Sequence, residues 1–161
     1  MFSLFKRRNT NPADLLTSGL YNESHFYAAF VRDLKKAKSE VIIESPYLSC
    51  RRTDELLPIF RKLVRKGVKV RINTRNPNHH NELLRIQGWK CFKQLRMTDV
   101  KIKLCNDFRH RKIAVIDRQV LWEGSLNILS QSNSREVMRR THSEALCKQM
   151  IRFIGLNRWY W

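Results

Sequence analysis

The sequence contains no long hydrophobic run, no C-x-x-C pair and no internal repeat. No stretch approaches the length of a membrane-spanning helix, and the start "MFSLFKRRNTNPADLL" has no apolar run long enough for a signal peptide. The cysteines stand too far apart for a zinc knuckle; they are Cys50, Cys91, Cys105 and Cys147. We therefore expect a cytoplasmic protein with reduced, partly buried thiols and no integral membrane association.

Acidic residues are scarce relative to basic ones. The chain has 14 Asp and Glu against 32 Lys and Arg, which gives a formal net charge of +18. This charge predicts a polyanionic partner, either nucleic acid or an anionic membrane surface; a basic surface that only aids solubility is the alternative. The 42% hydrophobic fraction is sufficient for a core, and 161 residues fit one domain.

Apolar residues recur at helical spacing in some segments and alternate in others. Phe26, Phe30 and Leu34 fall on one face of a helix. Thr53 or Asp54 can cap a later helix, in which Pro58 must lie near the first turn or cause a kink. The predicted elements up to residue 106 are a short helix over 11–20, a helix over 23–37, a strand over 40–45, a helix over 53–67, a strand over 68–77, a helix over 80–95 that Gly88 interrupts, and a strand over 100–106.

The last third of the chain begins with two strand-like runs, 110–117 and 119–125, which predict a tight antiparallel hairpin. The segment 128–140 is polar and is expected to be partly helical, whereas 143–161 is a strand or a helix with an aromatic tail. Alternating helices and strands predict an α/β layered domain, with a mixed β-sheet flanked by helices and partly parallel.

The stretch "HRKIAVIDRQVLWEGSLN", from His110 to Asn127, carries the most informative pattern. Alternate residues of a strand face the same side, so His110 and Lys112 project together. A histidine beside a fixed ammonium suits a phosphodiester, because the ammonium offsets the charge that repels an attacking electron pair. Ser125 and Asn127 can donate hydrogen bonds to the phosphate oxygens, and Gly124 permits close backbone approach. An H-x-K pair by itself more often decorates an exposed strand.

The compound pattern is H-x-K, four residues, D, six residues, G-S-x-N. It resembles the HKD signature of the phospholipase D (PLD) superfamily, in the form found in its single-motif nucleases. The matching residues are His110, Lys112, Asp117, Gly124, Ser125 and Asn127. The segment 45–77 also resembles the helix–strand unit that precedes the motif in PLD-like modules attached to bacterial helicase-like ATPases. The resemblance extends over roughly residues 22–150, so we assign 1–21 to a basic arm with a short helix and 22–161 to a PLD-like catalytic domain.

The resemblance implies a reaction that uses no metal and no cofactor. In the family, the motif histidine attacks phosphorus to form a phosphohistidine, and a second motif histidine protonates the leaving oxygen and then activates water. Carried over, His110 is the nucleophile or the general acid. Lys112 and Asn127 hold the phosphate, and Ser125 assists.

Two acidic residues complete the candidate catalytic set. Asp117 faces away from His110 on the strand, so we expect it to fix the hairpin turn or pair with a basic neighbour. Glu136 is the candidate for the acidic residue that orients the histidine in the family; the alternative is a solvated charge on a helix.

The chain has one HKD motif, whereas the implied reaction uses two histidines. None of the other histidines has a matching context; they are His25, His79, His80 and His142. His79 and His80 lie in the polar loop "NPNHHNE" and can in principle reach the site. A homodimer in which two copies of His110 meet at a twofold axis is the simpler prediction.

The positive net charge of the chain favours nucleic acid, either DNA or RNA, as the phosphodiester substrate. The candidate backbone-binding residues are Lys101, Lys103, Arg109, Arg111, Arg135 and Arg139. Trp89, Trp122 and Tyr47 are possible stacking platforms, with a core role as the alternative. A phospholipid such as cardiolipin is the alternative substrate, and the terminal "RWYW" then sits at the lipid interface instead of packing on the domain or a second copy.

Two other possibilities concern the role of the whole protein. The chain can be a non-catalytic nucleic-acid-binding module, although the intact motif argues against this. It can also act beside a separate helicase or ATPase, because it has no Walker motif of its own.

Overall fold

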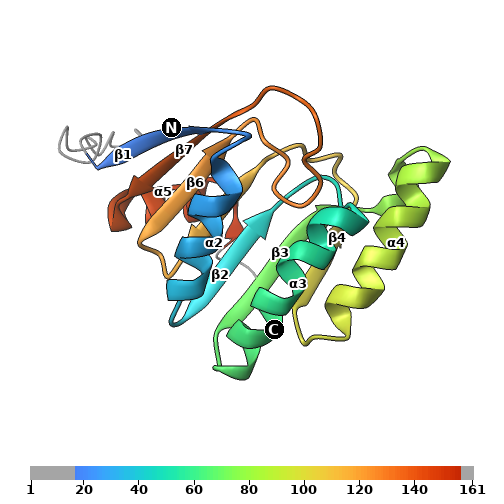
Figure 1. The fold of residues 1–161 in the computed structure, drawn as a ribbon, viewed down its shortest axis with the longest axis horizontal. Coiled ribbons are helices and arrows are strands. Elements are labelled where there is room, and N and C mark those ends of the chain that lie inside the picture. The colour runs from blue at the N-terminus through green and yellow to red at the C-terminus, as the bar shows by residue number, and fades with distance from the viewer. Residues whose placement is uncertain (1–16, 157–161) are drawn as a thin grey trace, which may run out of the picture.

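A computed structural model describes residues 17–156 of the chain. The predicted basic arm up to residue 16 and the "RWYW" end lie outside the described residues. A mixed sheet with strand order β1-β7-β6-β5-β2-β3-β4 forms the centre of the fold (Figure 1). Its strands are β1 (Ser18–Asn22), β2 (Glu40–Glu44), β3 (Lys69–Arg75), β4 (Lys101–Cys105), β5 (Ile113–Ile116), β6 (Val120–Gly124) and β7 (Val137–His142).

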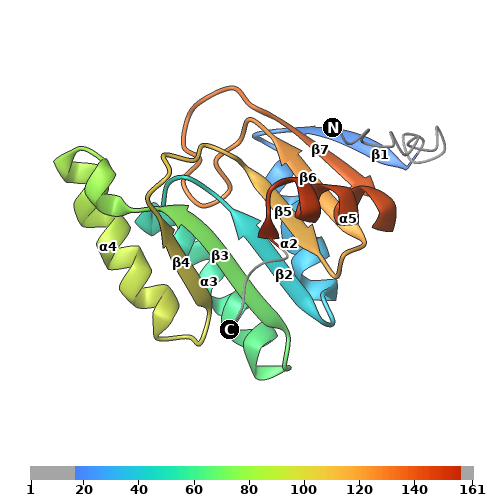
Figure 2. The same cartoon turned by 180° about the vertical axis from the view of Figure 1, so that it is seen from behind.

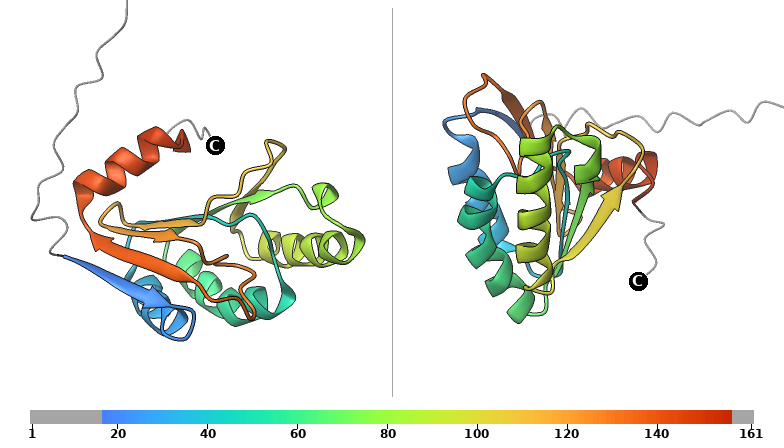
Figure 3. Two further views of the ribbon diagram at one scale, coloured as in Figure 1. Left: turned by 90° about the horizontal axis from the view of Figure 1, so that it is seen from above. Right: turned by 90° about the vertical axis from the view of Figure 1, so that its right-hand side faces the viewer.

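The helices lie in two layers, one on each face of this sheet. They are α2 (Phe26–Lys36), α3 (Cys50–Arg65), the short 3-10 helix η1 (Pro77–His79), α4 (Glu82–Arg96) and α5 (Glu144–Phe153). Helices α2, α3 and α4 cover one face, and α5 covers the other, as the front and back views show (Figures 1 and 2). The view from above shows the sheet between these two layers (Figure 3). The predicted α/β layered class with a mixed sheet is therefore confirmed.

Strand direction follows from the connections. Helices α3 and α4 carry the chain from β2 to β3 and from β3 to β4, and these pairs are parallel. Every other pair in the sheet is antiparallel. Strand β2 therefore lies between an antiparallel neighbour, β5, and a parallel one, β3. On one side of β2 the chain adds β3 and β4, and on the other side it adds β5, β6 and β7. In open α/β sheets, a point where the order of strands reverses in this way leaves a crevice outside the carboxyl ends of the strands.

Alternation along the central strands divides the core in two. Ile43, Ala114 and Trp122 belong to the larger cluster under α2, α3 and α4. Ile42 and Val115, which are their neighbours in sequence, belong to the smaller cluster under α5. Both faces of these strands are buried, as expected of strands with helices on each side.

Several predicted elements differ from the structure. The strand predicted over 110–117 is β5 and begins only at Ile113, so His110 and Lys112 precede it. Residues from Ser18 onward form edge strand β1 and not the end of a helix, so the sheet begins before the boundary predicted at residue 22. The segment predicted as partly helical over 128–140 is a loop that leads into β7. Helix α3 begins at Cys50 and is capped by Ser49, which accepts from the Arg52 amide, instead of by Thr53 or Asp54.

Pro58 and Gly88 both lie inside continuous helices. Pro58 is exposed, so water can hydrate the carbonyl that loses its partner. Gly88 does not interrupt α4 as predicted. A Cβ there would lie 3.0 Å from the ring of Pro77, so the glycine lets α4 pack against η1.

Candidate active site

The β5–β6 hairpin brings the two halves of the motif together. Ile113 pairs with Glu123, so the residues just before β5 lie beside those just after β6. Asp117 and Arg118 form the turn at the other end with φ of 52° and 55°. Such positive φ values are those of primed hairpin turns, which suit the twist of a two-stranded ribbon. The segment that carries His110 and Lys112 therefore lies alongside the start of the G-S-x-N segment.

His110 and Lys112 are in direct contact. The Lys112 ammonium lies 2.5 Å from His110 Nδ1 and donates to the His110 carbonyl at 2.7 Å. The side chain of Tyr47, which follows β2, meets the His110 ring edge-on with 5.9 Å between centroids. His110 is exposed and Lys112 half-buried, so the pair is accessible to a ligand.

The electrostatic setting of this pair favours a neutral imidazole. Partial burial lowers the pKa of His110 below its ordinary value, and the charges of Lys112 and Arg75 lower it further. Burial also lowers the pKa of Lys112, although the charge of Glu136 opposes that shift. A neutral imidazole keeps one ring nitrogen unprotonated, which a nucleophile or base requires.

Ser125 and Asn127 are held by backbone contacts. The Ser125 amide donates to the Val137 carbonyl at 2.9 Å, and its hydroxyl accepts from the Val137 amide at 3.1 Å. The Asn127 carbonyl accepts from the amides of Ser130 and Gln131. The side-chain oxygen of Asn127 is buried without a hydrogen-bond partner in the described chain. An unpaired buried amide is costly, so this side chain is suited to a bound ligand.

The close approach predicted at Gly124 is made by strand β7. A Cβ on Gly124 would lie 2.1 Å from the Val137 carbonyl oxygen and 2.9 Å from the Met138 Cα. The backbone of β7 therefore occupies the volume that any larger residue needs. This contact positions the segment that carries Ser125 and Asn127.

The two candidate acidic residues have different surroundings. Glu136 accepts from the Ser134 hydroxyl at 2.7 Å, and its charge acts on Lys112. No hydrogen bond joins Glu136 to His110 within residues 17–156, so the orienting role predicted for Glu136 stays a prediction. Asp117 lies at the turn, at the end of β5 remote from His110, where its carboxylate accepts from three consecutive amides, those of Lys38 to Glu40. It fixes the hairpin to the start of β2, and its position gives no support for a part in the chemistry.

Arg109 and Arg111 flank His110 in the segment just before β5. Both bind Glu44, a carboxylate that is 1% exposed at the end of β2. The distances are 2.5 Å from Arg109 Nη1 to Oε1 and 2.7 Å from Arg111 Nε to Oε2. Asn73 donates to the same carboxylate at 3.0 Å. The sequence predicted that these two arginines bind nucleic acid. In the structure both pair with the buried carboxylate of Glu44, and the three side chains form an ion-pair cluster next to the HKD segment.

The other predicted backbone-binding residues are spread over the molecule. Lys101 and Lys103 are exposed on β4, the edge strand next to α4. Arg135 is 93% exposed and paired with Glu23, near the G-S-x-N segment in the chain. Arg139 on β7 donates to the Ser18 hydroxyl. The structure therefore does not gather these four residues into one patch around His110.

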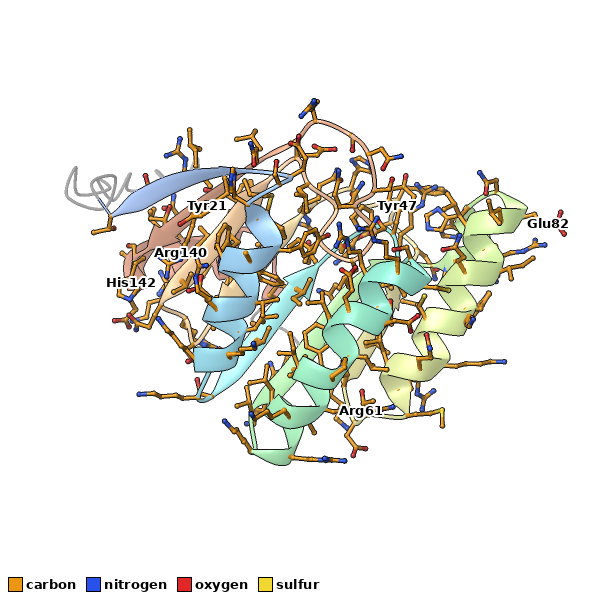
Figure 4. All side chains as sticks on the ribbon, viewed as in Figure 1. Tyr21, Tyr47, Arg61, Glu82, Arg140 and His142 are labelled. Atoms are coloured by element: carbon orange, nitrogen blue, oxygen red, sulfur yellow. The ribbon has the colours of Figure 1, made fainter. Side chains whose placement is uncertain are left out.

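Aromatic side chains divide between the core and the site. Trp122 is fully buried, and its indole N–H donates to Asp33 at 2.9 Å. It is therefore a core residue, as the alternative to a stacking platform predicted. Tyr47 lies beyond the end of β2 near the start of α3 (Figure 4). Its ring is 4.8 Å from that of His80, on the loop that the sequence placed within reach. Tyr47 thus contacts both His80 and His110.

Two searches of residues 17–156 bear on the class of site. No group of three or more His, Cys, Asp or Glu side chains is placed to hold a metal ion in this part of the chain. No helix formed by the same residues has the length and apolar character needed to span a bilayer.

The chain resembles known proteins in both sequence and fold. The family model "Cardiolipin synthase, PLD-like domain" matches residues 30–156. No curated protein sequence matches the chain. Among solved structures, the phospholipase D family member Nuc from Salmonella typhimurium superposes with a TM-score of 0.68 and 11% identity, over 84% of this chain and 90% of that one.

Two further structures share the fold. NucT from Helicobacter pylori has a TM-score of 0.64 and 18% identity, over 84% of this chain and 91% of that one. Polyphosphate kinase from Porphyromonas gingivalis has a TM-score of 0.69 and 13% identity, over 89% of this chain and 26% of that one. The family match spans most of the chain and includes the whole HKD pattern, so the chain belongs to the phospholipase D superfamily, as a PLD-like domain.

Proposed function

We propose that the chain is a metal-independent phosphodiesterase that cleaves nucleic acid, DNA most readily, through a phosphohistidine on His110. The observation that carries this proposal is the contact between His110 and Lys112, with a lowered histidine pKa, on the hairpin that also carries Ser125 and Asn127. The net charge of +18 favours a polyanionic substrate. The names of two structural neighbours, Nuc and NucT, are consistent with nuclease chemistry.

The residues support a reaction in two steps. An unprotonated nitrogen of His110 attacks phosphorus, and the bond from phosphorus to the leaving oxygen breaks as that oxygen takes a proton. Water then gives a proton to the group that protonated the leaving oxygen and attacks phosphorus, so the bond from phosphorus to His110 breaks, the phosphate ester is released and the imidazole is restored. Lys112 offsets the charge on the non-bridging oxygens throughout, and Asn127 binds them once its amide turns to donate.

The proton for the leaving oxygen requires a second acid. Within residues 17–156 no other histidine ring contacts that of His110: His25 bonds Asn22, His79 stacks on Phe108, and His80 lies against Tyr47. We therefore propose that His110 of a second copy supplies it, in a homodimer with the site at the interface. Sedimentation is expected to show a dimer at assay concentration, and a fully active monomer would contradict this step.

A phospholipid substrate is the second candidate, and two observations favour it. The matching family model is described as cardiolipin synthase, and the phosphatidylserine synthase of Haemophilus influenzae shares the fold with a TM-score of 0.64. A non-catalytic binding role has support only from the fold shared with TrmBL2, an archaeal chromatin protein, and does not use the His110–Lys112 contact. A separate helicase or ATPase partner and a cytoplasmic location stay predictions.

One experiment separates these candidates. The protein is incubated in EDTA with labelled single-stranded DNA, duplex DNA, RNA and cardiolipin vesicles in parallel. We expect cleavage of nucleic acid that His110→Ala abolishes. His142→Ala serves as the matched control, because this exposed histidine ends β7 at the far end of the hairpin. Strict dependence on a divalent ion, or hydrolysis of cardiolipin alone, would overturn the proposal.

A further inference from the structure

A cavity of about 390 Å³ opens next to the candidate active site. It lies outside the carboxyl end of β2, where strand direction changes and ligands of α/β sheets commonly bind. Its walls come from the start of α3, the first turns of α4 and the loop that follows the G-S-x-N segment. The lining residues include Tyr47, Arg51, Leu84, Gln87, Ser130 and Ser132.

The cavity shares two walls with the catalytic groups. Tyr47 lines the cavity, and its ring is also in edge-on contact with His110 at 5.9 Å. On the opposite wall, the Ser130 amide donates to the Asn127 carbonyl at 3.0 Å. His110 and Asn127 do not line the cavity themselves, but each contacts a residue that does, so a group esterified to a phosphate at His110 has the cavity within reach.

The lining suits a flat, uncharged group that has an apolar face and polar edges. Tyr47 offers a half-buried aromatic ring, and Leu84 adds an aliphatic wall. The hydroxyls of Ser130 and Ser132 make no hydrogen bond to other described residues, and they can donate or accept. No carboxylate lines the cavity, and Arg51 at its rim, whose side chain is 65% exposed, is paired with Glu55.

Size argues for a nucleoside and against a lipid tail. The volume is near the lower limit of the roughly 300–1,000 Å³ typical of small-molecule sites. Such a space holds one base and its sugar, whereas the acyl chains of a phospholipid need a longer apolar channel. The lining is mostly apolar, which suits the face of a base, and the hydroxyls of Ser130 and Ser132 can bond to its polar edge.

We propose that this cavity binds the nucleoside attached to the scissile phosphate, with its base stacked on Tyr47 and its polar edges bonded to Gln87, Ser130 and Ser132. The inference rests on the proposed cleavage of nucleic acid and names the substrate group that the site recognises. Hydroxyl and amide groups accept several patterns of donors and acceptors, so the base identity matters little.

The test compares normal and abasic oligonucleotides in protein variants that narrow the cavity. Leu84→Trp fills it from the α4 wall. Leu83→Trp is the matched control, because Leu83 is the preceding residue, is 68% exposed and does not line the cavity. The substrates are single-stranded DNA and a tetrahydrofuran oligomer of equal length, which keeps every phosphate and lacks every base.

For the wild-type protein, kcat/KM is expected to be about tenfold higher for DNA than for the abasic oligomer, the usual effect of stacking one base. Leu84→Trp is expected to reduce this ratio to about one, and Leu83→Trp to leave it unchanged. Equal rates for the two oligomers in the wild-type protein would overturn the inference.

A binding measurement keeps the inference testable without cleavage. Fluorescence anisotropy in a His110→Ala background is expected to show the same preference of about tenfold for DNA, lost on adding Leu84→Trp. If this preference appears but no nucleic acid is cleaved, the proposed function fails and the nucleoside site stands. If the preference is absent and Leu84→Trp instead lowers hydrolysis of cardiolipin vesicles, the cavity serves a lipid headgroup and the inference is wrong.

Discussion

Replacing Glu44 by glutamine tests whether the ion pairs next to the HKD segment hold the segment of His110 in place. The Glu44 carboxylate is 1% exposed and contacts Arg109 at 2.5 Å and Arg111 at 2.7 Å. These arginines are the two sequence neighbours of His110. Glutamine keeps the shape of the side chain, removes its charge and turns an amide group toward a guanidinium. Both arginines then lose their shared buried partner.

The expected loss of stability follows from burial. Removing one partner of a buried pair costs about 3–5 kcal/mol. Arg109 keeps its second partner, Asp107, and the side chain of Arg111 is 36% exposed, so we expect the lower end of that range. The free energy of unfolding is therefore expected to fall by about 3 kcal/mol, with a loss of cleavage as the segment moves.

Urea denaturation followed by circular dichroism measures this change. Glu55→Gln is the matched control, because Glu55 also pairs with two arginines but its side chain is 43% exposed. That variant is expected to lose no more than about 1 kcal/mol, as is usual for surface pairs. If Glu44→Gln loses no more than this control, the cluster does not hold the segment and the reasoning is wrong.

Three further predictions concern the site and the hairpin. The cleavage rate is expected to fall as pH drops through the lowered pKa of His110, because protonation removes the attacking lone pair. Arg75→Met removes a nearby positive charge and raises the pKa of His110, so the acidic limb of the kcat/KM profile is expected to shift to higher pH. Gly124→Ala is expected to lower the free energy of unfolding by about 3 kcal/mol in a thermal melt, because the new Cβ would lie 2.1 Å from the backbone of β7. Gly19→Ala is the control and should change the free energy of unfolding far less, because its Cβ would contact only the side chain of Tyr21, at 3.3 Å or more. Asp117→Ala is expected to cost about 2 kcal/mol through lost hydrogen bonds while activity per folded molecule persists, and a selective loss of activity would assign Asp117 to the chemistry.

The central elements were predictable because their signal is local. Strand β2 is a continuous apolar run, β3 alternates, and α2 carries its buried residues at helical spacing. The hairpin follows from its two apolar runs and the turn between them. His110 and Lys112 were predicted to share a strand face; they lie just before β5, and their side chains are nevertheless in contact. These features require no knowledge of distant partners.

The elements that the sequence did not reveal depend on long-range pairing. Strand β1 is a half-exposed edge that pairs only with β7, and β7 is mostly polar, with Met138 and Thr141 as its buried residues. Nothing local distinguishes such a strand from a loop or a helix. Glu44 was missed because a single acidic residue at the end of an apolar run resembles a strand terminus, and its arginine partners lie far along the chain.

The most direct test of the central claim is a search for a covalent nucleotide on His110. Single-stranded DNA labelled at both ends is mixed with the protein in EDTA, quenched in alkali and analysed by denaturing electrophoresis and peptide mapping. We predict that label is attached at His110 in the wild-type protein and that none is attached in His110→Ala. Cleavage that proceeds without a covalent species, or label on a different residue, would contradict the claim.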